Sequence, residues 1–247
     1  MYSLSEGIQL DELIESQFQR AEELLNELED EYGSALNKQE VTTRALNLTH
    51  EILMKLRSIL DQVMHQYFEK AIAPNLTTIE KERVKIYFPI VGSEESFRLR
   101  MGRNKMLRIE TDDPKTYDFI KSCQPFAHKG NGWLESLNKY AVEGKHIGLV
   151  PQKKQTHEKI TIIGPGGRVS WDPKCVEFGK GGTVTIGGAL IDPQTQRIVP
   201  TPNVEEVIES WVSFTFEGTE INALKLCREC LDNSRDLVKR FADLTNH

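Results

Sequence analysis

The chain lacks the features that would place it at once among membrane or secreted proteins. Its 247 residues contain no apolar run close to the roughly 20 residues that span a bilayer. Residues 1–10 have neither the basic start nor the apolar core of a signal peptide. We therefore expect a cytoplasmic protein that has no membrane partner.

An excess of positive charge is also missing, and cysteine is scarce. The net charge of −6 argues against nucleic-acid binding over the whole surface, although a local basic patch remains compatible with it. Four cysteines include one CxxC, Cys227 and Cys230, but no second pair or nearby histidine completes the four ligands of a zinc site. No βαβ context activates a redox thiol either. We expect two small apolar residues on a packed helix face, with no metal and no cofactor.

What the sequence does have is helical periodicity near its start. Apolar residues recur every three or four positions over residues 9–32, among many glutamates, and the same pattern continues to about residue 71. Gly33 is expected to end the first helix, Ser34 or Asn37 to begin the second, and Pro74 to close it. Two long helices joined by a short turn predict an antiparallel hairpin, the usual start of a helical bundle.

The pattern changes after residue 158. Short β-branched and aromatic segments, separated by glycine or proline, predict a small antiparallel sheet, with strands at 160–163, 169–171, 183–186 and 211–216. The glycines at 164–167 fit a turn better than a phosphate loop, because they do not lie between a strand and a following helix. Those at 179–182 lack the remaining spacing and the terminal Lys-Ser/Thr of a phosphate loop. A last helix is expected over residues 220–244. The predicted fold is α+β, with a helical bundle over 1–150, a β region over 151–217 and a C-terminal helix, 218–247, that packs back on the bundle.

Three chemically useful side chains, Arg57, Asp61 and His65, follow one another at four-residue intervals in the second helix. This spacing puts them along one helix face, at the edge of its apolar side. As a catalytic set, Arg57 would stabilise phosphate charge, His65 would act as general acid or base, and Asp61 would orient one of them. The alternative is a structural ion pair between Arg57 and Asp61 with a histidine at the polar edge.

A second group of candidates is basic and could hold RNA. If the nuclease interpretation is correct, a cationic track must lead to the active site. The alternative is an ordinary solvated charge run and, for the last pair, a favourable helix end. The candidates are Arg98, Arg100, Arg103, Lys105, Arg108, Lys145 and His146.

Four short motifs, spread over most of the chain, give it a family resemblance. They are Leu-Arg-x-x-Leu-Asp at 56–61, Phe-Pro-Ile at 88–90, Gln-Pro-Phe at 124–126 and Lys-His at 145–146. In this order they resemble a family of uncharacterised bacterial helical proteins, which has no settled activity. Where that family continues around its last motif with Asn, Asp and Arg, this chain has Ala141, Gly144 and Ile147.

The long helices are also distantly similar to the HEPN superfamily of helical bundles in prokaryotic defence and toxin systems. That resemblance implies a metal-independent endoribonuclease with an arginine and a histidine on one helix, assembled across a dimer axis. Arg57 and His65 are separated by more residues than the usual HEPN spacing. The preferred prediction is a non-catalytic binding or scaffold protein of a prokaryotic system, a homo-oligomer whose acidic first helix or sheet binds a protein partner. The alternative is the HEPN-like endoribonuclease.

Overall fold

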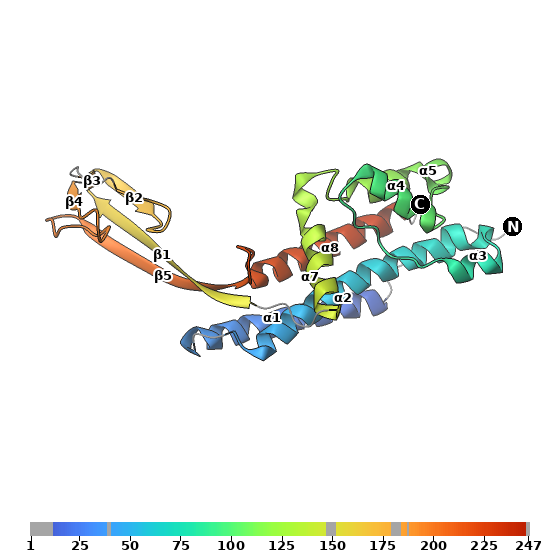
Figure 1. Ribbon diagram of the computed structural model, residues 1–247, viewed down its shortest axis with the longest axis horizontal. Helices are drawn as coiled ribbons and strands as arrows, with labels where there is room; N and C mark the ends of the chain where they lie inside the picture. The colour runs from blue at the N-terminus through green and yellow to red at the C-terminus, as the bar shows by residue number, and fades with distance from the viewer. Residues whose placement is uncertain (1–11, 39–40, 147–151, 179–183, 187, 246–247) are drawn as a thin grey trace. The chain divides into compact units, whose positions relative to one another are not determined.

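The structure is a computed structural model that describes residues 12–38, 41–146, 152–178, 184–186 and 188–245 (Figure 1). The chain divides into two compact units. The helical unit contains Met1–Lys153 and Thr215–His247, and the β unit contains Lys154–Phe214. The predicted α+β fold is confirmed, with long N-terminal helices that pack together and antiparallel strands before the last helix. Within the described ranges, no helix has the length and apolar character needed to cross a membrane.

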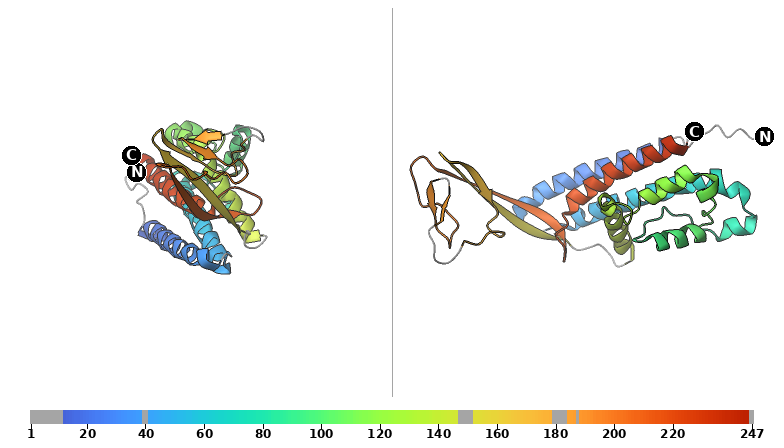
Figure 2. Two further views of the ribbon diagram at one scale, coloured as in Figure 1. Left: turned by 90° about the vertical axis from the view of Figure 1, so that its left-hand side faces the viewer. Right: turned by 90° about the horizontal axis from the view of Figure 1, so that it is seen from above.

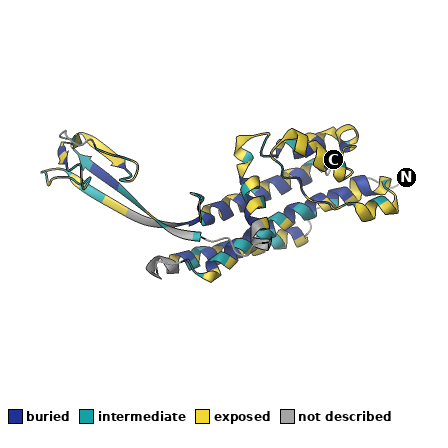
Figure 3. Ribbon diagram, viewed as in Figure 1, coloured by how far each residue is buried: buried dark blue, intermediate teal, exposed yellow. Residues whose placement is uncertain are grey.

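Three long helices form the core of the helical unit: α1 (Glu12–Lys38), α2 (Thr43–Tyr67) and α8 (Ala223–Thr245). Each contacts the other two, and the views in Figures 1 and 2 show them running side by side. Their buried residues recur at helical spacing on the facing sides, as the dark stripes in Figure 3 show. Completely buried examples include Phe18, Ile52, Leu56, Ile59 and Phe241.

The prediction for the turn between α1 and α2 was wrong. Gly33 does not end α1, which continues to Lys38, and α2 begins at Thr43 rather than near Ser34 or Asn37. A single glycine inside a helix costs only about 1 kcal/mol relative to alanine, which packing against two other helices readily offsets. Thr42 is the true start signal, because its side chain accepts a hydrogen bond from the Ala45 N–H at 3.1 Å.

The end of α2 follows the expectation more closely. After Tyr67 the chain continues as a π-helical turn, Phe68–Ile72, and a 3₁₀ turn, Ala73–Asn75. Pro74 lies in that last turn, where its missing N–H and fixed φ prevent a longer helix. The helix therefore loosens before it stops, close to the predicted residue.

Shorter helices pack around the three long ones. Thr77 caps the first of them in a capping box with Glu80, and that helix ends at Arg83. The next helix begins after Ser93, whose side chain caps it by accepting from the Ser96 N–H. The bounds are α3 (Thr78–Arg83), α4 (Glu94–Arg103), α5 (Ile109–Asp112), α6 (Pro114–Ser122), a 3₁₀ turn (Lys129–Asn131) and α7 (Gly132–His146).

The β unit is built from hairpins. Strand β1 (Gln152–Gly164) pairs antiparallel with β2 (Gly167–Trp171), so that Ile160 lies opposite Trp171, and β5 (Glu205–Phe216) is the other neighbour of β1. A separate pair joins β3 (Val184–Ile186) and β4 (Ala189–Ile191). The glycine turn at 164–167 does connect two strands, and Gly167 takes a positive φ of 120° that other residues rarely adopt. The sequence had not indicated β4.

The core of the β unit is thin. Its buried cluster consists of Ile160, Ile162, Trp171 and Ile191, and other apolar side chains pack against it only partly buried. Trp171 is also held by a neutral amide, because its indole Nε1–H donates to Gln196 Oε1 at 3.0 Å. The same Gln196 side chain donates to the carbonyls of Pro173 at 3.0 Å and Val176 at 2.8 Å. One side chain thus ties together the loop that follows β2.

Candidate functional site

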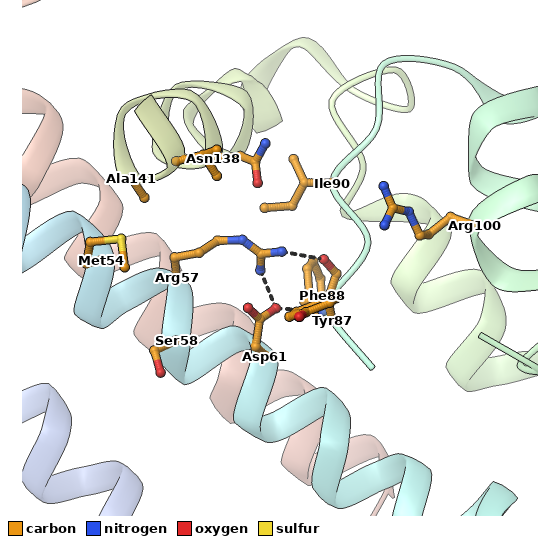
Figure 4. Close-up of a pocket in the computed structure, with 11 residues that line it drawn as sticks. Met54, Arg57, Ser58, Asp61, Tyr87, Phe88, Ile90, Arg100, Asn138 and Ala141 are labelled. Carbon is orange, nitrogen blue, oxygen red and sulfur yellow. Dashed lines mark hydrogen bonds and ion pairs between the residues drawn. The ribbon is translucent and has the colours of Figure 1, made fainter. Parts of the chain in front are cut away.

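Arg57 and Asp61 lie on the face of α2 that meets the extended segment after α3. Arg57 Nη1 donates to Asp61 Oδ1 at 2.6 Å, and Arg57 Nη2 donates to the carbonyl oxygen of Phe88 at 3.0 Å. The N–H of Phe88 in turn donates to Asp61 Oδ1 at 2.8 Å. The three groups form a closed ring of hydrogen bonds, drawn in Figure 4. This ring fixes the backbone of residue 88 against α2.

Burial sets the electrostatics of this pair. The side chain of Arg57 is 14% exposed and that of Asp61 is 23% exposed. Burial lowers the pKa of Arg57 from its usual range, although the Asp61 carboxylate opposes the change. Burial also raises the pKa of Asp61, against the opposing effects of Arg57 and the Phe88 N–H. Each charge is therefore tolerated because the other lies beside it.

A pocket of about 470 Å³ opens beside the ring of hydrogen bonds. Its walls come from α2, from the segment after α3, from α4 and from α7, so that four parts of the helical unit meet there (Figure 4). Volumes in this range are typical of small-molecule sites. The lining residues are Met54, Arg57, Ser58, Asp61, Tyr87, Phe88, Ile90, Arg100, Asn138, Ala141 and Val142.

His65 is not among the residues that line this pocket. Its side chain is 58% exposed, and its Nε2 lies 3.8 Å from Glu69 Oε1, a surface pair on the same helix. His65 follows Arg57 by eight positions, and at 100° per residue the helix direction differs by about 80° over that interval. The structure therefore brings Arg57 and Asp61 together and leaves His65 apart from them.

The predicted basic track is largely neutralised by nearby acids. Arg98 pairs with Glu110 at 3.0 Å, Lys105 with Glu80 at 3.7 Å and Arg108 with Asp112 at 3.4 Å. These are exposed pairs, each of which contributes at most about 1 kcal/mol to stability.

The two remaining arginines of that group differ from the paired ones. Arg100 and Arg103 are exposed on α4, and neither has a carboxylate partner among the described residues. Arg100 lines the pocket, and Arg103 does not. Lys145 and His146 belong to the last turn of α7, but their side chains lie outside the part of the chain that the structure describes.

Several pocket residues were not predicted from the sequence. Asn138 comes from α7, and Tyr87 and Phe88 come from the segment before Pro89. Proline favours an extended conformation for the residue before it, and in this segment the Phe88 N–H reaches Asp61. Nothing in the periodicity of α7 distinguishes Asn138 from any other polar position on that helix.

A second cavity, of about 210 Å³, lies beside Cys123 and His128. Burial raises the pKa of the Cys123 thiol to about 11, so that the nucleophilic thiolate is rare at neutral pH. His128 Nδ1 accepts a hydrogen bond from the Gly130 N–H at 2.9 Å, which caps a 3₁₀ turn. His128 therefore has a structural role at this position.

The CxxC cysteines are buried on one face of α8, and burial raises the pKa of both Cys227 and Cys230. The Cys230 thiol faces the carbonyl oxygen of Trp133 at 3.9 Å. Among the residues that the structure describes, no three histidine, cysteine, aspartate or glutamate side chains are grouped as a metal site requires.

Comparison with known proteins identified no relative of this chain. A scan against protein-family models, a search of curated proteins and a search of solved structures each gave no match. The site is therefore interpreted from its own geometry.

Proposed function

We propose that this protein is a non-catalytic binding protein whose helical unit holds a small ligand in the pocket beside Arg57. The observation that carries the proposal is the ring that joins Arg57, Asp61 and the Phe88 backbone. These hydrogen bonds hold the Phe88 backbone to α2, and the pocket next to them remains open.

The ring is poorly suited to proton transfer. Asp61 Oδ1 accepts hydrogen bonds from both Arg57 and Phe88, so protonating it would weaken the contacts that hold the pocket wall. The histidine that a general acid–base mechanism needs is exposed outside the pocket. These features favour a pocket wall with a structural ion pair over a catalytic centre.

The pocket itself has the composition of a ligand site. Apolar side chains, among them Met54, Ile90 and Val142, line it together with polar groups from the same elements. Such mixed linings bury the body of a ligand and orient it through a small number of hydrogen bonds. The homo-oligomer, the protein partner and the prokaryotic context stay predictions from the sequence.

The carboxylates on the acidic face of α1 form ion pairs with other helices, which favours the pocket, rather than α1, as the binding site. Glu22 pairs with Arg235 and Glu29 pairs with Arg228, both on α8, and Glu27 pairs with Arg44 on α2. These carboxylates therefore connect helices within the unit.

The proposal is tested by ligand-observed NMR with a library of small fragments. Val142 lines the pocket and is 42% exposed, so Val142→Trp should narrow the pocket without disturbing the core. Val169→Trp is the matched control, because Val169 is 45% exposed on β2 in the other unit. We expect a set of fragments that binds the unmodified protein and the control but not Val142→Trp. If every fragment binds all three proteins equally, the pocket is not the binding site.

The nuclease alternative is examined with the same protein preparations. Labelled single-stranded RNA, incubated with the protein and a chelator, should remain intact. Cleavage that His65→Ala abolishes and His128→Ala retains would overturn the non-catalytic proposal, because contaminating nucleases are insensitive to either substitution.

A further inference from the structure

We infer that the pocket binds an organic anion with an apolar body, and that Arg100 recognises its negative charge. This inference rests on the proposed binding function and names the ligand class of the same pocket. It depends on the charges of the lining residues, on their free hydrogen-bond donors and on the position of the apolar wall.

The charged residues around the pocket leave one positive charge uncompensated. Arg57 and Asp61 neutralise each other at 2.6 Å, and the third charged lining residue is Arg100. In the close-up of Figure 4 no dashed line reaches its guanidinium. The pocket is therefore locally positive in a chain whose net charge is −6.

Among the described residues Arg100 has no carboxylate partner, which distinguishes it from several neighbours in the chain. Arg98, Lys105 and Arg108, in the same stretch of chain, each have a carboxylate within 4 Å. Repulsion between Arg57 and Arg100 also adds to the burial that lowers the pKa of Arg57, which indicates that the field of Arg100 reaches the pocket wall. An anion between the two guanidinium groups would relieve this repulsion.

Hydrogen-bond donors are available for the oxygens of such an anion. The guanidinium of Arg57 has five N–H groups, and its hydrogen bonds to Asp61 and Phe88 leave others unused. Arg100 offers a complete planar fork, the geometry that matches carboxylate and phosphate oxygens. The side-chain amide of Asn138 has no hydrogen-bond partner within the described ranges and also lines the pocket.

The rest of the pocket lining argues against a purely inorganic ion as the ligand. Met54, Ile90, Ala141 and Val142 add apolar surface to the lining. A pocket of about 470 Å³ is also far larger than the volume of one phosphate group. A ligand that fills it pairs its charge with the arginines and covers the apolar wall with a ring or a short chain.

The ligand class is tested by isothermal titration calorimetry with four probes: phenyl phosphate, benzoate, inorganic phosphate and phenol. We expect phenyl phosphate or benzoate to bind more tightly than both inorganic phosphate and phenol, because only these two combine charge with an apolar body. Whichever of the two binds more tightly distinguishes a phosphate ester from a carboxylate. Equal binding of phenol and the aromatic anions would overturn the inference, as would inorganic phosphate binding as tightly as phenyl phosphate.

Arg100→Gln and Arg103→Gln provide the matched pair of variants. Both remove one unpaired arginine from α4, but only Arg100 lines the pocket. We expect Arg100→Gln to weaken binding of the aromatic anion by about tenfold, the loss of one charge-assisted interaction, and Arg103→Gln to leave it unchanged. Equal effects of the two variants would indicate general electrostatic attraction and contradict a specific role for Arg100.

The two proposals fail in different ways. If neutral or cationic fragments bind in a manner that Val142→Trp abolishes and Arg100→Gln does not affect, the pocket is a binding site and the anion inference is wrong. If no probe or fragment responds to Val142→Trp, both proposals are wrong.

Discussion

The helical unit and the β unit each use one polar cluster to hold a distant segment in place, but the clusters differ in kind. In the helical unit a charged pair, Arg57 and Asp61, binds both backbone groups of Phe88. In the β unit the neutral amide of Gln196 binds Trp171 and two carbonyl oxygens. The charged pair costs more free energy to bury than the neutral amide, because each charge must be desolvated. An open polar pocket also lies beside it.

The units also differ in how much apolar surface supports these clusters. In the helical unit, α1, α2 and α8 bury side chains along most of their length, whereas the β unit buries one small cluster around Trp171. Small units bury a lower fraction of their surface and are correspondingly marginal in stability. The same loss of a polar contact should therefore have more visible structural consequences in the β unit.

The largest effect is expected from Asp61→Ala. Removing the carboxylate leaves the buried guanidinium of Arg57 without its counter-charge and the Phe88 N–H without its acceptor. We expect a loss of about 3 kcal/mol in the free energy of unfolding of the helical unit, measured by urea denaturation.

The paired variant Arg57→Leu with Asp61→Leu is the control for this effect. It removes both charges together, so it should be markedly more stable than Asp61→Ala. A double variant as unstable as the single one would show that the hydrogen bonds to Phe88, rather than charge compensation, dominate.

A smaller effect, about 1–3 kcal/mol, is expected from Gln196→Ala, because an indole N–H and two carbonyl oxygens lose their partner. Hydrogen exchange should show faster exchange of amides in β1 and β2, with amides in α2 unchanged. Gln194→Ala is the matched control, since Gln194 is exposed in the preceding turn. Equal acceleration in both units would contradict their separation into two compact units.

The smallest expected effect concerns how fast the cysteine thiols react with a reagent, a difference that involves no change in stability. Cys175 is exposed in the β unit, whereas Cys123, Cys227 and Cys230 are buried in the helical unit, where burial raises their pKa values. At pH 8 one thiol should react rapidly with a disulfide reagent and the others at least roughly ten times more slowly. Mass spectrometry of labelled peptides identifies the reactive residue. Rapid labelling of Cys227 or Cys230 would show that α8 opens readily.

The sequence predicted the regular elements best where periodicity and capping agree. Apolar periodicity indicated the long helices α1, α2 and α8, and the β-branched segments indicated β1, β2, β3 and β5. The prediction that α1 ends at Gly33 was wrong, because packing against other helices outweighed the local helix-breaking effect of glycine. No local sequence pattern reveals that packing. The sequence also did not resolve α4, whose residues have little apolar periodicity of their own.

The candidate site also has one part that the sequence predicted and another that it did not. The four-residue spacing on α2 correctly implied that Arg57 and Asp61 meet, since helix geometry alone brings them together. The position of His65 could not be predicted in this way, because exposure depends on which segments cover each side of α2. Asn138 and Arg100 contribute to the pocket only through the packing of α7 and α4.

By itself, the sequence determined the α+β class, the helical hairpin and the contact between Arg57 and Asp61, all of which follow from periodicity, turn residues and distances along one helix. Only the tertiary structure decided that the Phe88 backbone closes this pair into a ring, that His65 lies outside the pocket and that Arg100 remains unpaired at its edge. The physical reason is that burial and charge compensation depend on residues far apart in the chain, which short-range geometry does not specify.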